Sequence, residues 1–169
     1  MGALGSSVST ALLVKDVQGK ELTLGSTPNP VSPEDSRAHL ERIKGLLGPV
    51  PAWLRGIERT ASCAGTNSMF TLCCIVLTSL AAADGNPQTF TFFDLAQAER
   101  ALQACLEKSD ADLLLYADYP NSDGPHLVVP KLALLLAVMR HAGIRSVETV
   151  KCVGSCAGLL CDSRHWQGR

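Results

Sequence analysis

The alternation of apolar and polar positions along the chain predicts strands interleaved with helices. Near the start, two short apolar-rich segments, Ala11 to Lys15 and Glu21 to Leu24, flank the stretch Asp16-Val17-Gln18-Gly19-Lys20. Gly19 can adopt the backbone conformation that a tight turn requires. We therefore expect a β-hairpin within residues 11–27.

A helix is expected to begin after Ser32, which can cap it, with Pro33 at the first helical position. Glu34 and Asp35 then place negative charge at the positive end of the helix dipole. The apolar residues that follow recur at helical spacing and stop before a Gly-Pro pair; they are Leu40, Ile43, Leu46 and Leu47.

The middle of the chain reads as a strand, a polar turn and a buried helix. We expect a strand over Ile57 to Ala61, a turn at Cys63-Ala64-Gly65-Thr66-Asn67, and a helix from Ser68 to Ala82 that is apolar on nearly all sides. Its apolar run, Leu72 to Ala83, is well short of the roughly 20 residues that a membrane span needs. The helix is therefore expected in the core.

Two further helices follow. Thr91 is expected to cap the first, with Asp94 as the acid of a capping box and a buried stripe that begins at Leu95. Leu113 to Ala117 fits either another helix or a short strand, and Tyr119 to Pro125 is expected to be a loop. Asp118, Asp123 and His126 are read as a solvated polar group of this region.

The last unit has the clearest pattern. A helix is expected from Val129 or Pro130 to His141, with Gly143 as its stop. A strand over Ser146 to Val153 and a glycine-containing turn, Gly154 to Gly158, should follow. Strands interleaved with helices predict an α/β domain with a mixed sheet, and no linker divides residues 1–169 into two domains.

Composition narrows the class of protein. The chain has 169 residues, 46% of them hydrophobic, and a formal net charge of −1, which does not favour a nucleic-acid binder. The first residues lack the basic start of a signal peptide, so we expect a cytoplasmic protein without a membrane segment. Most of the seven cysteines lie in apolar segments and are expected to be reduced core thiols. Cys152, Cys156, Cys161 and His165 are spaced more loosely than a zinc knuckle, so buried thiols are favoured there too.

Six stretches, in the correct order, resemble the second ribonuclease-H-like domain of the Ppx/GppA phosphatases, the exopolyphosphatase and guanosine pentaphosphate phosphohydrolase family. They are Gly5-Ser6-Ser7-Val8-Ser9-Thr10-Ala11-Leu12, Ser32-Pro33-Glu34-Asp35, Ser62-Cys63-Ala64-Gly65-Thr66, Phe90-Thr91-Phe92-Phe93-Asp94-Leu95, the helix from Val128 to Arg140, and Gly154 to Leu160.

The resemblance implies a ribonuclease-H-like fold of the actin-like ATPase superfamily and hydrolysis of phosphoanhydride bonds in polyphosphate or guanosine pentaphosphate. It implies Mg²⁺ as cofactor. A degenerate phosphate loop would occupy residues 1–10 and the α/β remainder residues 32–169. Phosphate would be held by backbone amides and hydroxyls of two groups of residues, which are Gly5, Ser6, Ser7, Ser9, Thr10 and Gly65, Thr66, Asn67. From the residues alone, a frayed start and a capped turn are the competing interpretations of these groups.

The chain also departs from the family pattern. Ala3 or Leu4 stands where the family has an acid, Thr10-Ala11 replaces Thr-Glu, and Cys156-Ala157 replaces Arg-Glu. The short segment before Gly5 leaves little room for the first strand of the fold, which predicts an open sheet edge completed by a complementary domain or a second subunit. We therefore carry two hypotheses: an incomplete or inactive phosphatase half-site, and a non-catalytic phosphate-binding or assembly module.

Overall fold

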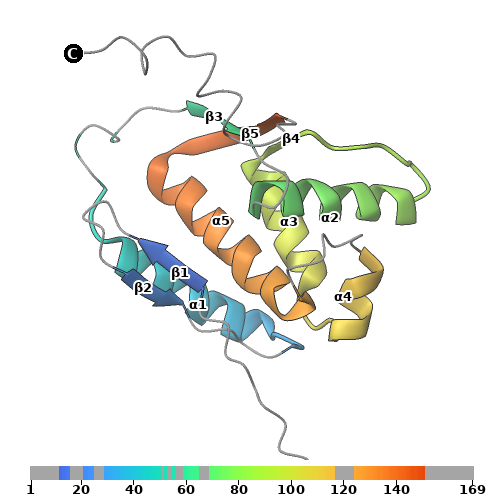
Figure 1. Ribbon diagram of the computed structural model, residues 1–169, viewed down its shortest axis with the longest axis horizontal. Helices are drawn as coiled ribbons and strands as arrows, with labels where there is room; N and C mark the ends of the chain where they lie inside the picture. The colour runs from blue at the N-terminus through green and yellow to red at the C-terminus, as the bar shows by residue number, and fades with distance from the viewer. Residues whose placement is uncertain are drawn as a thin grey trace, which may run out of the picture.

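The computed structural model describes residues 12–15, 21–24, 29–50, 52, 55, 59–64, 69–116 and 124–150. Within these ranges five strands and five α-helices follow one another in the order β1, β2, α1, β3, α2, β4, α3, α4, α5, β5 (Figure 1). The α/β class expected from the sequence is confirmed.

The first two strands form the expected hairpin. β1 (Leu12–Lys15) and β2 (Glu21–Leu24) pair antiparallel, with Leu12 opposite Leu24 and Lys15 opposite Glu21. They make a two-stranded sheet that is separate from the sheet of the other strands.

Helix α1 (Pro33–Leu47) begins and ends as the sequence predicts. The Ser32 hydroxyl accepts a hydrogen bond from the Asp35 amide at 3.0 Å, and Pro33 opens the helix. Gly48 ends it with φ of 67°, a conformation that favours glycine. The side chain of Ile43 is almost fully buried, and helix α1 packs against α5 (Val128–Ala142).

A second, mixed sheet has three strands in the order β3-β5-β4. β3 (Arg59–Ala64) runs parallel to β5 (Ile144–Val150), and the short β4 (Phe92–Asp94) runs antiparallel to β5. The mixed sheet was expected, but β5 begins two residues earlier than predicted, and β3 continues through Cys63 and Ala64, which were predicted to belong to the following turn.

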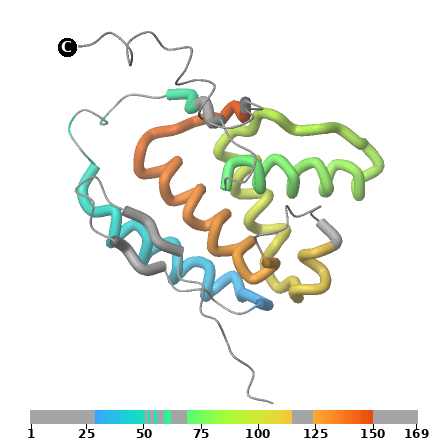
Figure 2. The backbone as a smooth tube through the Cα atoms, viewed as in Figure 1, coloured from blue at the N-terminus to red at the C-terminus, as the bar shows by residue number. Residues whose placement is uncertain are grey.

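The hydrophobic core lies between this sheet and the helices α2 (Met69–Ala83), α3 (Leu95–Cys105) and α5, which lie on one side of it (Figures 1 and 2). Phe93 and Val147 point from the sheet into the core and are fully buried. Helix α5 contacts α1, α2, α3 and β5. It is therefore the central element of the domain, which explains why its sequence is nearly all apolar.

The predicted start of α3 is wrong. Asp94, not Thr91, is the N-cap: its carboxylate accepts from the Gln97 amide at 2.7 Å, while the Gln97 side chain accepts from the Asp94 amide at 2.9 Å. Residues 92–94 are extended because this conformation buries Phe93 and pairs it with Val147. The sequence Thr-Phe-Phe-Asp was read as the first helical turn, but tertiary packing makes it a strand.

The segment after α3, for which the sequence allowed either a helix or a strand, forms a helix. Leu113 lies in a helix, α4 (Asp110–Tyr116), which the Ser109 hydroxyl begins by accepting from the Asp112 amide at 3.2 Å. A short 3₁₀ turn, η2 (Pro125–Leu127), then leads directly into α5, which starts at Val128.

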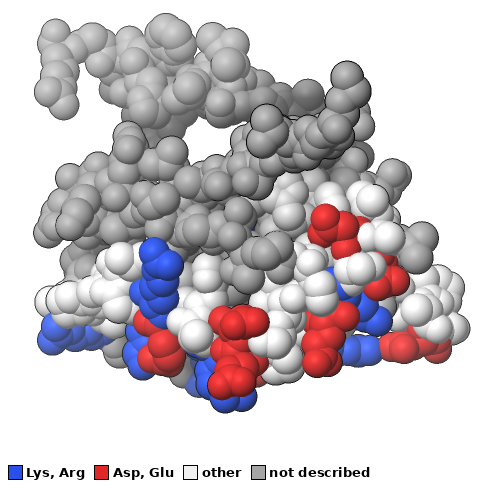
Figure 3. Space-filling model, turned by 90° about the horizontal axis from the view of Figure 1, so that it is seen from below, with Lys and Arg blue, Asp and Glu red and all other residues white. Residues whose placement is uncertain are grey.

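Acidic and basic side chains are interspersed on the face seen in Figure 3.

Candidate functional site

The carboxyl ends of two parallel strands, β3 and β5, lie side by side. Ala64, the last residue of β3, is in register with Val150, the last residue of β5. Gly65, Thr66 and Asn67 come directly after β3 in the sequence, and the glycine-containing segment from Gly154 begins four residues after β5 ends. In α/β sheets, ligands bind beyond the carboxyl ends of parallel strands. This edge is therefore the candidate site.

The N-terminal end of helix α2 follows the same edge of the sheet closely in the sequence. It begins at Met69, five residues after β3 ends, and its first turn contains no acidic residue. The first amides of a helix have no partner within the helix and carry partial positive charge. They can therefore bind an anion such as phosphate.

Thr149 and Glu148 lie next to the end of β5, and they differ in their surroundings. The Thr149 amide and hydroxyl both donate to the Thr91 carbonyl, at 2.7 and 2.9 Å, so Thr149 ties β5 to the start of β4. Its hydroxyl also lies 3.7 Å from the Cys74 thiol of α2. Glu148 is exposed on the opposite face, in register with Phe92. Glu148 was not among the predicted site residues, because a single acidic residue within a strand forms no recognisable motif.

The predicted phosphate-binding residues lie outside the described ranges. This holds for Gly5, Ser6, Ser7, Ser9 and Thr10, and for Gly65, Thr66 and Asn67, although β3 and α2 bracket the second group. The tail residues Cys152, Cys156, Cys161 and His165 lie outside them too. Within the described ranges, three or more metal-binding side chains do not gather at any point.

Three cysteines whose side chains the structure describes fit the expectation of reduced core thiols. Cys73 and Cys74 of α2 and Cys105 of α3 are buried and form no disulfide. Burial, with smaller contributions from Cys74 and Cys105, raises the pKa of Cys73. Burial likewise raises the pKa of Cys105 to about 12. Cys73 and Cys105 are therefore protonated near neutral pH, and the protonated thiol is not the nucleophilic form.

The structure corrects the interpretation of His126 as part of a solvated loop. The residue is half-buried in η2, and its Nε2 atom is buried without a hydrogen-bond partner in the described part of the chain. Its ring lies so close to Gly124 that a side chain at position 124 would collide with it. Asp118 and Asp123, the other members of the predicted group, lie outside the described residues.

Comparisons with protein-family models, with curated proteins and with solved structures found no match. Among the helices that the structure describes, none has the length and apolar character needed to cross a bilayer.

Proposed function

We propose that this chain is a phosphate-binding domain of the Ppx/GppA type, and that it binds phosphate at the carboxyl edge of β3 and β5. The observation that carries the proposal is the parallel pairing of these strands, with Ala64 beside Val150. The two segments that the family resemblance singles out, which begin at Gly65 and Gly154, come after these strand ends in the sequence. Helix α2 begins five residues after β3 ends, and the positive end of its dipole would favour an anion there.

The ribonuclease-H-like fold is part of the same proposal. The order β3-α2-β4-α3-α4-α5-β5 follows the order of the family motifs along the chain. A complementary domain or second subunit would supply the missing strand and the other half of the site.

We propose that the isolated chain does not hydrolyse its ligand. Phosphoanhydride cleavage needs a carboxylate to orient water and usually Mg²⁺ to hold the phosphate oxygens. In the described part of the chain, the acid of β5 near this edge is Glu148, which is exposed and belongs to no group of three or more metal-binding side chains. Polyphosphate or guanosine pentaphosphate would be the ligand, and Mg²⁺ would be needed only in the completed site.

The alternative is a module that uses phosphate only to assemble with a partner. The replacement of Arg-Glu by Cys156-Ala157 favours it, because both groups that would act on phosphate are lost there. A cytoplasmic location suits either form, since buried free thiols such as Cys73 and Cys105 are typical of reducing compartments.

A matched pair of substitutions at the two ends of α2 tests the site. Asn67 precedes the start of α2 and Asn86 follows its end, where the Asn86 side chain is exposed. Asn67→Asp adds a negative charge at the proposed phosphate position and leaves Ser68, the residue directly before α2, unchanged. Asn86→Asp makes the same chemical change at the far end of the helix.

The measurement is the thermal midpoint with and without polyphosphate, because a ligand of the folded state raises it. A ligand at one hundred times its dissociation constant stabilises by about 2.7 kcal/mol. We expect this gain for the wild type and Asn86→Asp, and its loss in Asn67→Asp. An equal gain in all three proteins would contradict the proposed edge.

A phosphate-release assay tests the proposal that the isolated chain does not hydrolyse polyphosphate. The purified chain with Mg²⁺ and polyphosphate should release no phosphate. Sustained release that Asn67→Asp abolishes would show instead that the isolated chain is a complete hydrolase.

A further inference from the structure

A cavity lies between α1 and α5, away from the carboxyl edge of the sheet. It has a volume of about 310 Å³, at the lower end of the range for small-molecule sites. Residues of the last turns of α5 line it, so it lies beside the start of β5, while the proposed phosphate edge lies at the end of that strand. The two sites are therefore distinct.

One part of the cavity wall is apolar. Leu40 of α1 and Val50 after it are half-buried, and Ala137 of α5 is buried. Arg55 fixes the segment after α1, because its Nε donates to the Val50 carbonyl at 2.9 Å. The small side chain of Ala137 leaves space where a larger residue of α5 would fill the gap. An aliphatic or aromatic group would gain free energy by covering this wall.

The other part of the wall is mainly basic. Lys44 comes from α1, and Arg140 and His141 come from the last turn of α5. Glu41 is the acid among the described lining residues, 3.4 Å from the Lys44 amine. Both side chains of that pair are largely exposed, so the pair contributes little and can rearrange. Arg140 and His141 also offset the negative end of the α5 dipole.

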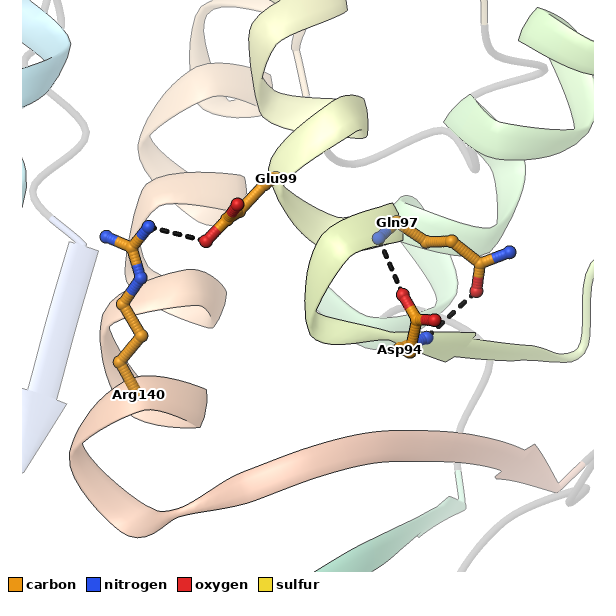
Figure 4. Close-up of polar contacts among 4 residues, drawn as sticks. All are labelled: Asp94, Gln97, Glu99 and Arg140. Atoms are coloured by element: carbon orange, nitrogen blue, oxygen red, sulfur yellow. Dashed lines mark hydrogen bonds and ion pairs between the residues drawn. The ribbon is translucent and has the colours of Figure 1, made fainter.

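Arg140 is held in place from the far side of α5. Its Nη2 donates to Glu99 Oε1 of α3 at 2.6 Å (Figure 4). In Figure 4 the second terminal nitrogen of the guanidinium points away from Glu99. A guanidinium has five N–H donors, and the bond to Glu99 leaves others for a ligand carboxylate.

We propose that this cavity binds a small amphipathic carboxylate. The apolar body would cover Leu40, Val50 and Ala137, and the carboxylate would bind Arg140 and Lys44. The volume suits a ligand of about a dozen non-hydrogen atoms. A free phosphate lacks the apolar body, and an amine would face Lys44 and Arg140, so both should bind more weakly.

The probe is 4-phenylbutyrate, titrated into the full chain and followed by calorimetry or NMR. We expect saturable binding with a dissociation constant of roughly 1 mM, as ligands of this size allow. The amine of the same shape, 4-phenylbutylammonium, and inorganic phosphate should bind at least about tenfold more weakly. A wild-type protein that does not bind 4-phenylbutyrate, or binds the amine equally well, would overturn the proposal.

Two pairs of variants locate the site. Arg140→Gln should weaken 4-phenylbutyrate binding about tenfold or more, whereas Arg100→Gln should not. The control is closely matched, because Arg100 also makes an exposed ion pair, with Asp84 at 2.6 Å. Ala137→Leu should abolish binding by filling the cavity, and the same change at exposed Ala82 should not.

Circular dichroism of each variant shows whether it is folded. If Ala137→Leu does not fold, Arg140→Gln alone decides, and binding unchanged in that variant overturns the proposal. Asn67→Asp should leave 4-phenylbutyrate binding unchanged, so that failure of the phosphate edge and failure of this cavity are told apart.

Discussion

At the start of α3, the side chains of Asp94 and Gln97 satisfy each other's backbone amides. This reciprocal pair is a capping box, and it directly follows the three-residue strand β4 (Figure 4). The cap therefore marks the point at which the extended chain becomes helical. Phe93, the residue just before the cap, is fully buried in the core.

Replacement of the Asp94 carboxylate should cost measurable stability. Asp94→Ala is expected to lower the free energy of unfolding by about 1 kcal/mol, because an amide at the helix start loses its acceptor. Asp94→Asn retains an acceptor oxygen and should lose much less. Urea unfolding of the three proteins checks this, and equal losses in both variants would show that the charge matters rather than the cap.

The N-cap of α1 could be predicted from the sequence, whereas the N-cap of α3 could not. Ser32-Pro33-Glu34-Asp35 combines a cap, a first-turn proline and acids, and it was read correctly. Thr91 and Asp94 are both good caps, three residues apart. The choice between them depends on the burial of Phe93 against β5, a contact that local sequence does not contain.

Among the elements, α5 contributes most to the core. Its residues from Val128 to Ala137 are buried apart from Lys131, and Leu135 is fully buried. Leu135→Ala is expected to lower the free energy of unfolding by about 2–5 kcal/mol through lost burial and a cavity. Leu114→Ala, at a side chain that is 54% exposed in α4, should change it by less than about 0.5 kcal/mol.

Denaturant unfolding of this pair compares the same substitution in two environments. A similar cost at both positions would contradict the central place of α5. If Leu135→Ala does not fold, Leu135→Met keeps most of the volume and should cost less than about 1.5 kcal/mol.

The long elements were predictable from their periodicity, and the short ones were not. α1 has the predicted ends, and α2 and α5 differ from the sequence expectation by at most two residues at each end, because their apolar stripes and stop signals are strong. β4 has three residues, too few to show an alternating pattern, and was missed. The segment around Leu113 is a single short helix whose apolar residues fit either structure until Ser109 and Asp112 are seen to cap it.

In the whole molecule, the buried thiols should couple stability to alkaline pH. Burial raises the pKa of Cys105 to about 12 from 9.0, so the folded protein favours the protonated thiol. This contribution is complete below about pH 9 and declines as pH rises toward 12, because the unfolded chain releases its proton first.

The stability difference between the wild type and Cys105→Ala tests this coupling. Measured by urea unfolding with reductant present, the difference should be about 1 kcal/mol smaller at pH 10 than at pH 8. The comparison cancels the ionisation of other groups that both proteins share. A difference that stays constant with pH would mean that Cys105 is not protonated preferentially in the folded state.

The sequence singled out the segments that begin at Gly65 and Gly154 but could not show that the strands before them lie side by side. That arrangement depends on the parallel register of Ala64 with Val150, strand ends that are distant along the chain. The α1–α5 cavity was not predictable at all. Lys44 and Arg140 belong to separate helices whose patterns indicate only which faces are apolar, not where two helices leave space between them.

The joint between α5 and β5 has a consequence for how related chains should vary. Gly143 alone connects the helix to the strand, with φ of 65°, and its carbonyl accepts from the Arg59 amide at 3.2 Å. An inserted residue there would shift the strand against β3 and disturb the register of both. The exposed segment between α2 and β4 has no such restriction. Evolution should therefore have changed the length of the domain at residues 85–89 and preserved it at residue 143.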